Sequence, residues 1–333
     1  MGGQSGAAGA SSGSGGVGGT ETAGTGGSSG SAGSAGSGGS AGGLPPGCEA
    51  LGTPGMNGLQ CDPGTDGNGT FDQEEPDSAV PPEAEGDPQG EFTETDSFDS
   101  TLYGYAFNYR IYVPTQYQPG KPAALMIFQD GPNYYNVIRT PQIMDTLIAA
   151  GEMPVAIAVF IEPGQQRSEE YDTRDEKYGN FLLDEFLPNV VLNTYDIVDD
   201  PNGWLIGGHS SGGGCAFNAA WFNVDKFHKI VTHNGTFVGL QDPGNDDYIE
   251  LVTQEALKPL RVTLHSGTND LGGDTWFNAN NDMSASLMEA GYPYRYMKST
   301  TSHDLQPWAS GGFPDTLRWI WRGYSLPHYE VVP

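Results

Sequence analysis

The sequence predicts an α/β fold of three layers, in which a mostly parallel sheet is covered by helices on both faces. Two observations support this. From about residue 105, short apolar runs alternate with longer amphipathic runs, as they do when helices connect parallel strands by right-handed crossovers. Several of the short runs are apolar on both faces, which is typical of strands in a sheet that is covered on both sides.

Each expected element is a run of this kind. The expected strands are residues 109–114, 123–129, 154–161, 204–208, 228–235 and 260–267. The expected helices are residues 140–151, 175–195, 211–223 and 278–291, with 313–324 as a closing helix. In such sheets the reacting groups collect at the carboxyl ends of the strands.

Composition divides the chain into three regions. Residues 1–47 are nearly all Gly, Ser, Ala and Thr, so they have too little apolar surface to offset the entropy of ordering, and we expect a disordered tether. Residues 48–91 hold a Cys-bounded loop and an acidic, proline-rich linker, which we expect to add nothing to the core. Residues 92–333 have a size that is usual for one α/β domain.

The charge of the chain excludes some partners. There are 42 acidic and 14 basic residues, for a formal net charge of −28, and no Lys or Arg precedes Arg110. Such a chain repels nucleic acid and anionic membrane surfaces, so we expect neither as a partner. No apolar run is long enough for a membrane-spanning segment.

The Gly/Ser-rich start is typical of a chain that follows a removed export signal. We therefore expect an extracellular or cell-surface protein, with a lipid anchor upstream of residue 1 as an open alternative. Cys48 and Cys61 bracket a Gly/Pro loop and could close a small disulfide, which would fit an oxidising compartment. Cys215 stands apart from them and is expected to be a buried apolar residue.

A calcium loop is an open alternative in the same region. Asp62, Asp66 and Asn68 have a spacing similar to that of a calcium loop, but the Glu that closes such a loop is absent. A simple turn is the competing interpretation, since Asp, Asn and Gly are all common in turns.

The segment GWLIGGHSSGGGCAF, residues 203–217, connects an expected strand to an expected helix. Its Gly208-His209-Ser210-Ser211-Gly212 fits G-x-S-x-G, the sharp turn that carries the nucleophile of α/β-hydrolases. The central serine takes a strained backbone conformation that lifts its hydroxyl clear of the sheet, and the flanking glycines leave the room. We predict Ser210 as the nucleophile and the Ser211 amide as an oxyanion donor. An ordinary Gly/Ser turn is the alternative.

A serine nucleophile needs a base and an acid that orients the base, and α/β-hydrolases place them in the order acid, then histidine. Asp270 follows the strand at 260–267 and is the predicted acid, with Asp274 and Asp304 as competitors. Of the two later histidines, His303 lies in a polar loop and is the predicted base, whereas His328 lies in the tail beyond the last helix.

Two further site residues are expected near this triad. A second oxyanion donor should come from the loop after the strand at 123–129, where the amide of Gln129 or Asp130 could serve, and we choose Asp130. Trp276 could offer a platform for a sugar or aromatic ring, with core packing as the alternative.

The runs MIFQDGPNYY, GEMPVAIAVFIEPG, RSEEYDT, YGNFLLDEFLPNV, IGGHSSGGGCAFNAAW, SGTNDLGG and PDTLRWIW resemble the enterochelin-esterase-like esterases, which are related to the feruloyl and acetyl-xylan esterases of carbohydrate esterase family one. The resemblance covers about residues 92–325. It implies an α/β-hydrolase fold and a serine esterase without cofactor or metal, with Ser210, Asp270 and His303 as the triad. The histidine loop departs from the family, since relatives often have GGHN where this chain has TSHDLQPWASGG.

The similar Arg-Ser-x-Glu-Tyr segment implies that Arg167 and Tyr171 bound the substrate pocket. A loop salt bridge among Arg167, Glu169 and Glu170 is the alternative. The expected function is that of a secreted carboxylic ester hydrolase acting on a small-molecule or polysaccharide-linked ester. An acyltransferase that uses a sugar hydroxyl as acceptor and a non-catalytic surface binding module are the alternatives.

Overall fold

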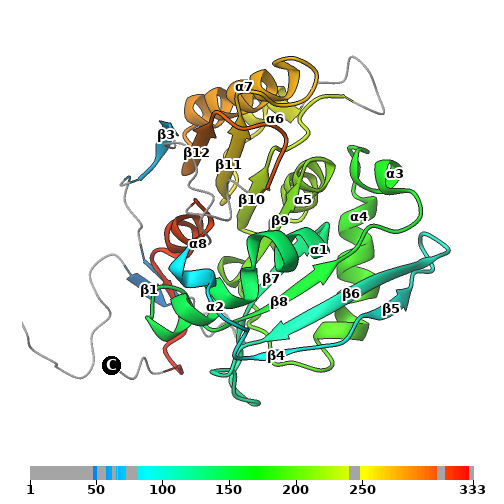
Figure 1. Cartoon of the computed structure of the whole chain (residues 1–333), viewed down its shortest axis with the longest axis vertical. Helices are drawn as coiled ribbons and strands as arrows, with labels where there is room; N and C mark the ends of the chain where they lie inside the picture. Colours follow the sequence, from blue (N-terminus) through cyan, green and yellow to red (C-terminus); the bar gives the residue numbers. More distant parts are fainter. Residues whose placement is uncertain are drawn as a thin grey trace, which may run out of the picture. The chain divides into compact units, whose positions relative to one another are not determined.

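The computed structural model describes residues 48–50, 58–61, 65, 67–72, 81–239, 248–305 and 312–329. A ten-stranded sheet forms the centre of this part of the chain (Figure 1). Its strands in order are β3 (Gly69–Asp72), β12 (Tyr294–Ser299), β11 (Arg261–Gly267), β10 (Lys229–His233), β9 (Trp204–His209), β7 (Ala124–Gln129), β8 (Ala156–Ile161), β6 (Ala106–Val113) and β4 (Glu91–Phe92), and β5 (Asp96–Asp99) also pairs with β6. The strands from β3 to β8 run parallel, whereas β6 is antiparallel to β8, β4 and β5.

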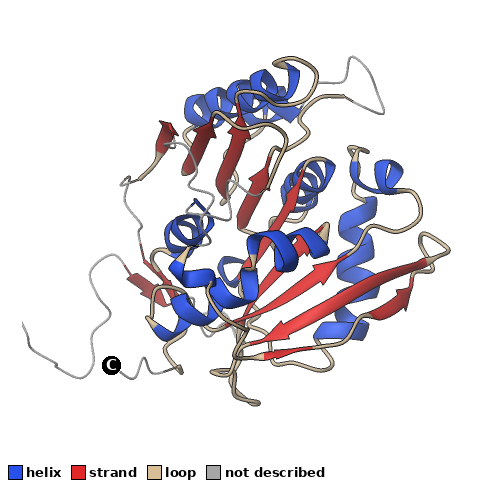
Figure 2. Ribbon diagram, viewed as in Figure 1, coloured by secondary structure: helices blue, strands red, loops and turns tan. Residues whose placement is uncertain are grey.

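Helices lie on both faces of the sheet (Figure 2). α2 (Thr140–Ala149) contacts α8 (Phe313–Trp321), α5 (Ser211–Phe222) contacts α3 (Arg167–Tyr171) and α4 (Lys177–Asn180), and α7 (Thr275–Ala290) contacts α6 (Tyr248–Gln254). The shorter elements are α1 (Gly131–Asn133), η1 (Pro82–Ala84), η2 (Tyr134–Ile138), η3 (Phe181–Val191) and η4 (Pro201–Gly203). A separate small sheet holds β1 (Cys48–Ala50), β2 (Leu59–Cys61) and β13 (Tyr324–Ser325). The predicted three-layer α/β fold is confirmed.

The central strands form where the sequence is apolar on both faces. Every residue of β7 and β8 is buried, because helices cover both sides of these strands. The aromatic ring of Phe128 on β7 stacks on Tyr134 at 4.3 Å and on Phe160 at 5.7 Å between ring centroids. This packing fixes the end of β7, from which the loop that carries Asp130 begins.

The helix predicted at 175–195 is present, but most of it is a π-helix rather than an α-helix. It begins as α4 and continues as the π-helix η3, which contains Pro188. A proline has no N–H to donate and its ring crowds the preceding turn, and a wider helical turn accommodates both effects. At the end of η3, the Leu192 amide donates to the Leu187 carbonyl, five residues back, at 2.9 Å.

Residues 48–91 contribute to the fold, contrary to the expectation that they add nothing to the core. β3 pairs with β12 at the edge of the main sheet, and β2 pairs with β13. In η1, Ala84 is fully buried, and Glu83 forms an ion pair with Arg318 of α8 at 2.9 Å. The described residues of the 48–91 region thus contribute strands and the buried Ala84 side chain to the fold. Short edge strands are held by backbone hydrogen bonds, which composition does not reveal.

The cysteines are arranged as the sequence allows. Cys61 is disulfide-bonded, and Cys48 is its register partner in the antiparallel pair of β1 and β2. Cys215 is free and buried, as expected. The calcium-loop alternative depends on Asp62 and Asp66, which lie outside the described residues.

The described residues contain neither a cluster of metal ligands nor a helix that could span a membrane. No group of three or more His, Cys, Asp or Glu side chains there could hold a metal ion. Within the same residues, no helix combines the length and the apolar character that crossing a bilayer requires.

These contacts predict different effects for two truncations. Removal of residues 1–43 should leave thermal stability unchanged, because this segment offers almost no apolar side chains to a core. Removal of residues 1–91 deletes β3, one of the two residues of β4, the buried Ala84 and Glu83, one of the acidic partners of Arg318. This removal should cost about 2–4 kcal/mol of folding stability. Thermal unfolding of both truncated proteins measures the difference, and equal midpoints would show that residues 44–91 do not support the fold.

Candidate active site

Ser210 occupies the turn between β9 and α5 in a strained backbone conformation. Its φ is 58° and its ψ is −125°, a region that non-glycine residues rarely adopt. The Ser210 amide donates to the His233 carbonyl of β10 at 2.8 Å, and its own carbonyl accepts from the amides of Gly213, Gly214 and Thr236. These bonds hold the turn from the neighbouring strand and from the helix, which leaves the serine side chain partly exposed.

The two glycines of the G-x-S-x-G pattern are required by close contacts. A Cβ atom at Gly208 would lie 2.2 Å from the Gly212 carbonyl oxygen. A Cβ atom at Gly212 would lie 2.7 Å from Oδ2 of Asp130. Neither position can carry a side chain without movement of its neighbour, so both glycines serve the strained turn at Ser210.

The structure brings Asp270 and His303 together. Nδ1 of His303 lies 2.5 Å from Oδ1 of Asp270, whose side chain is fully buried while that of His303 is 13% exposed. Asp270 follows β11 at its carboxyl end, and His303 lies in the loop after β12. The other predicted candidates for the acid, Asp274 and Asp304, are both exposed.

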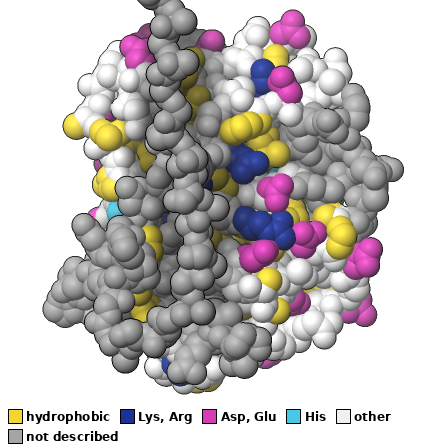
Figure 3. Space-filling model, turned by 90° about the vertical axis from the view of Figure 1, so that its left-hand side faces the viewer, with side chains coloured by type: hydrophobic (Ala, Val, Ile, Leu, Met, Phe, Trp, Pro, Cys, Tyr) yellow, Lys and Arg dark blue, Asp and Glu magenta, His cyan; other side chains and the backbone are white. Residues whose placement is uncertain are grey.

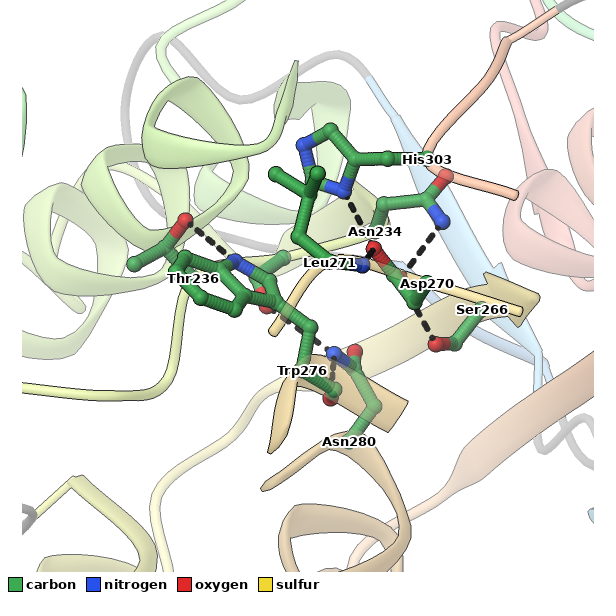
Figure 4. Close-up of polar contacts among 9 residues, drawn as sticks. Asn234, Thr236, Ser266, Asp270, Leu271, Trp276, Asn280 and His303 are labelled. Atoms are coloured by element: carbon green, nitrogen blue, oxygen red, sulfur yellow. Dashed lines mark hydrogen bonds and ion pairs between the residues drawn. The ribbon is translucent and has the colours of Figure 1, made fainter. Parts of the chain in front are cut away.

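Three groups that the sequence analysis did not select hold the Asp270 carboxylate (Figure 4). Asn234 Nδ2 donates to Oδ2 at 2.8 Å, Ser266 Oγ donates to Oδ2 at 3.3 Å, and the Leu271 amide donates to Oδ1 at 2.7 Å. Burial raises the pKa of Asp270, but the hydrogen bonds from His303, Asn234 and Leu271 outweigh it and lower that pKa below its ordinary value. Asp270 therefore stays ionised beside the imidazole.

Asn234 could have been found by the reasoning that found Asp270. It directly follows β10 at its carboxyl end, where its φ is 48°, just as Asp270 lies beyond the end of β11. A polar residue at that edge of a parallel sheet is a candidate for the site.

The outer nitrogen of the His303 ring is available for chemistry. Nε2 of His303 is buried and has no hydrogen-bond partner among the described residues. It therefore makes no hydrogen bond to the Ser210 hydroxyl in this structure. The His303 ring lies 4.9 Å from the ring of His209, the residue before Ser210. In structures without substrate, catalytic hydrogen bonds are often unformed. Burial, together with the nearby His303 and Arg167, lowers the pKa of His209 to about 3, so this ring stays neutral.

The residues predicted for the oxyanion hole lie on either side of this turn. Asp130 follows β7 in a left-handed conformation, with φ 54° and ψ 42°, and Ser211 is the first residue of α5, where N–H groups lack helical acceptors. Pro132 has no N–H, so the donors at the start of the β7–α1 loop are the amides of Asp130 and Gly131. Gln129, the alternative to Asp130, has a fully buried side chain.

The predicted substrate-binding residues have different surroundings. Arg167 is part-exposed, and its guanidinium forms a two-bond ion pair with Asp130, at 2.8 and 2.7 Å, instead of the salt bridge with Glu169 and Glu170 that was the alternative. Tyr171 is only 1% exposed and packs beneath Arg167, with the guanidinium 5.3 Å from its ring centroid. Tyr171 is therefore buried beneath Arg167 rather than exposed to a substrate.

Trp276 lies beside the predicted base. Its ring is edge-on to that of His303, with centroids 6.2 Å apart and planes at 80°. The indole nitrogen donates to Thr236 Oγ1 at 3.1 Å, which fixes the ring on the same side of the site (Figure 4). Part of the indole remains exposed, so it is placed both to pack against His303 and to meet a ligand.

A parallel sheet flanked by helices, with a strained serine at a strand-to-helix turn and a bonded aspartate–histidine pair at the same sheet edge, defines an α/β-hydrolase. A family model described as "Putative esterase" matches residues 100–318. The chain belongs to this Esterase family, a class of carboxylic ester hydrolases.

Similar proteins carry related names. The iron(III) enterobactin esterase of Dickeya dadantii (strain 3937) is 28% identical over 231 residues, and the chain spans about half of that protein's length, with the match covering 64% of this chain and 52% of that one. A ferulic acid esterase structure superposes with a TM-score of 0.60 at 21% identity, covering 70% of this chain and 99% of the other. The enterobactin esterase of Shigella flexneri gives 0.60 at 17% identity, covering 71% and 60%. At these identities the solved structures establish the fold.

Proposed function

We propose that the chain is a secreted serine esterase that works through Ser210, His303 and Asp270. The bond between Asp270 and His303 is the observation that carries this proposal, because it orients an imidazole at the sheet edge where Ser210 stands. An aspartate in this position selects the imidazole tautomer whose Nε2 can accept a proton.

The proposed reaction has two steps. Ser210 Oγ attacks the ester carbonyl carbon while His303 Nε2 takes the hydroxyl proton, and the oxyanion is held by the amides of Ser211 and Asp130. The C–O bond to the alcohol then breaks as His303 returns the proton to the leaving oxygen. Water repeats the sequence on the acyl-enzyme, with His303 again as base, and releases the acid and free Ser210.

Two features support export as part of this proposal. Cys61 is disulfide-bonded, and such bonds persist mainly in oxidising compartments outside the cytosol. The Gly/Ser-rich residues 1–47 have the composition of a spacer that separates a folded domain from a surface.

The charge around the site favours a neutral ester over an anionic one. Arg167, the cation beside the turn that carries Ser210, is already neutralised by its ion pair with Asp130. Three carboxylates lie next to site residues in the sequence: Asp172 follows Tyr171 at the end of α3, Asp274 lies between Asp270 and α7, and Asp304 follows His303. Figure 3 shows one face of the molecule, viewed from the left-hand side of Figure 1, and the Lys and Arg side chains visible on it also lie next to Asp and Glu side chains. We therefore propose an uncharged, feruloyl-type ester rather than an iron–catecholate complex as substrate.

A panel of esters tests both parts of the proposal. The purified protein should hydrolyse p-nitrophenyl butyrate and methyl ferulate, and should prefer iron-free enterobactin to its trianionic ferric complex by about tenfold at low salt. Each protein carboxylate about 8 Å from a substrate charge contributes about 0.5 kcal/mol in water, and added salt should narrow the gap. Faster cleavage of the ferric complex would contradict the neutral-substrate proposal, whereas no cleavage of any ester would contradict the esterase itself.

A further inference from the structure

Arg167 of α3 contacts the side chain of Asp130 and the backbone carbonyl of His209, the residue before Ser210. Its Nε and one terminal nitrogen donate to the two oxygens of Asp130 in the β7–α1 loop, at 2.8 and 2.7 Å. The same terminal nitrogen reaches the carbonyl of His209, the last residue of β9, at 3.5 Å. One guanidinium therefore connects the two loops from which the oxyanion donors are expected.

The Asp130 carboxylate is also packed directly against the nucleophile turn. A Cβ atom added to Gly212 would lie only 2.7 Å from Oδ2 of Asp130. The Asp130 side chain is only 9% exposed. Asp130 itself has a left-handed backbone, with φ 54°. Because a non-glycine residue adopts this conformation at a cost, its side-chain bonds have to hold it in place.

The helix that carries Arg167 is rigidly attached to the domain. The Glu170 carboxylate, which is 1% exposed, accepts the amides of Gly164 at 2.8 Å and Gln166 at 3.0 Å and the Tyr105 hydroxyl at 2.6 Å. The buried Tyr171 ring supports the guanidinium from below. Arg167 is thus held from its own side and can act as a fixed point for Asp130.

We infer that Arg167 is a positioning residue, which keeps the Asp130 loop against the nucleophile turn so that the oxyanion donors point at the same place. This inference rests on the proposed function. It assigns Arg167 no contact with substrate, because its fork is occupied by Asp130. The interaction is specific to arginine, since a lysine cannot make two parallel bonds to one carboxylate.

Kinetics of Arg167→Ala and Arg167→Lys test the inference with p-nitrophenyl butyrate. Loosening an oxyanion donor rather than deleting it should lower kcat about 10- to 100-fold in Arg167→Ala, with KM changed less than about threefold. Arg167→Lys should recover only a small part of the loss. About 50 mM guanidinium chloride should raise kcat of Arg167→Ala at least about fivefold and leave the wild type unchanged, because the ion can refill the fork at Asp130.

Controls separate positioning from other roles. Glu169→Gln, on the exposed side of the same helix, should leave kcat and KM at wild-type values. The double variant Arg167→Ala/Asp130→Asn should be little worse than Arg167→Ala, because both act in one unit. A raised KM with unchanged kcat in Arg167→Ala would show that Arg167 contacts the substrate. A loss of kcat that is explained by a smaller folded fraction and is not rescued by guanidinium would show that Arg167 has only a structural role. Either result overturns the inference. A wild type that hydrolyses no ester would instead remove the proposed function.

Discussion

Ser210→Ala is expected to lower kcat by about 10⁴-fold or more, whereas Ser211→Ala should lower it by about tenfold at most. The two hydroxyls are neighbours, but only Ser210 has the strained conformation of the nucleophile turn. In the proposed reaction Ser211 contributes only its backbone amide, which alanine retains. Its hydroxyl lies beside Asp172, whose pKa is raised by burial and lowered in part by the Ser211 and Ser168 hydroxyls. Steady-state rates on p-nitrophenyl butyrate measure both variants.

The comparison needs folded proteins. Circular dichroism and thermal unfolding of the two variants should match the wild type, because each substitution removes one oxygen atom. A dead Ser211→Ala beside an active, folded Ser210→Ala would reverse the assignment of the nucleophile.

The kcat of His303→Ala should be nearly as low as that of Ser210→Ala. The kcat of the double variant Ser210→Ala/His303→Ala should be little lower than that of either single variant, because the two residues act as a unit. Asp270→Asn should cost about 10³- to 10⁴-fold in kcat, since an amide can stabilise the wrong imidazole tautomer without removing the base. Rates at saturating substrate measure these losses. An additive double variant, or an Asp270→Asn protein within about tenfold of the wild type, would contradict the triad.

The direction of the Asp270 pKa shift adds a pH dependence. Because the folded-state pKa of this carboxyl is below its unfolded value, its ionisation stabilises the fold at pH values above the unfolded value. That stability is lost as pH falls through the folded-state pKa. The stability of Asp270→Asn should therefore fall less steeply with acid than that of the wild type, which unfolding at a series of pH values measures.

The parallel core of the sheet could be predicted because its strands are buried on both faces. β7 and β8 consist of apolar runs with no polar face, and such runs have few alternatives in an α/β chain. The edges could not be predicted in the same way. β3 is mostly exposed and lies in a region rich in Gly and acidic residues, so its place beside β12 depends on backbone pairing with a strand that is remote in sequence.

The positions of the site residues could be predicted from the ends of the strands, but most of the contacts among their side chains could not. Asp270 and His303 lie at one sheet edge, as the topology requires, so their bond could be expected. Nothing in the local sequence indicates that Arg167 reaches Asp130. Asp130 lies in the loop after β7 and Arg167 in the helix α3 after β8, so the contact depends on how both segments fold back over the sheet. Only the three-dimensional structure therefore shows that the Arg167 side chain bonds to Asp130 of the protein.

The most direct test of the central claim is the site of covalent labelling by a fluorophosphonate. Mass spectrometry of the digested, labelled protein should find one adduct per chain, on Ser210, with labelling retained in Ser211→Ala and slowed at least about a hundredfold in His303→Ala. An adduct on Ser211 or on another residue, or the absence of any adduct from a protein that hydrolyses esters, would contradict the account.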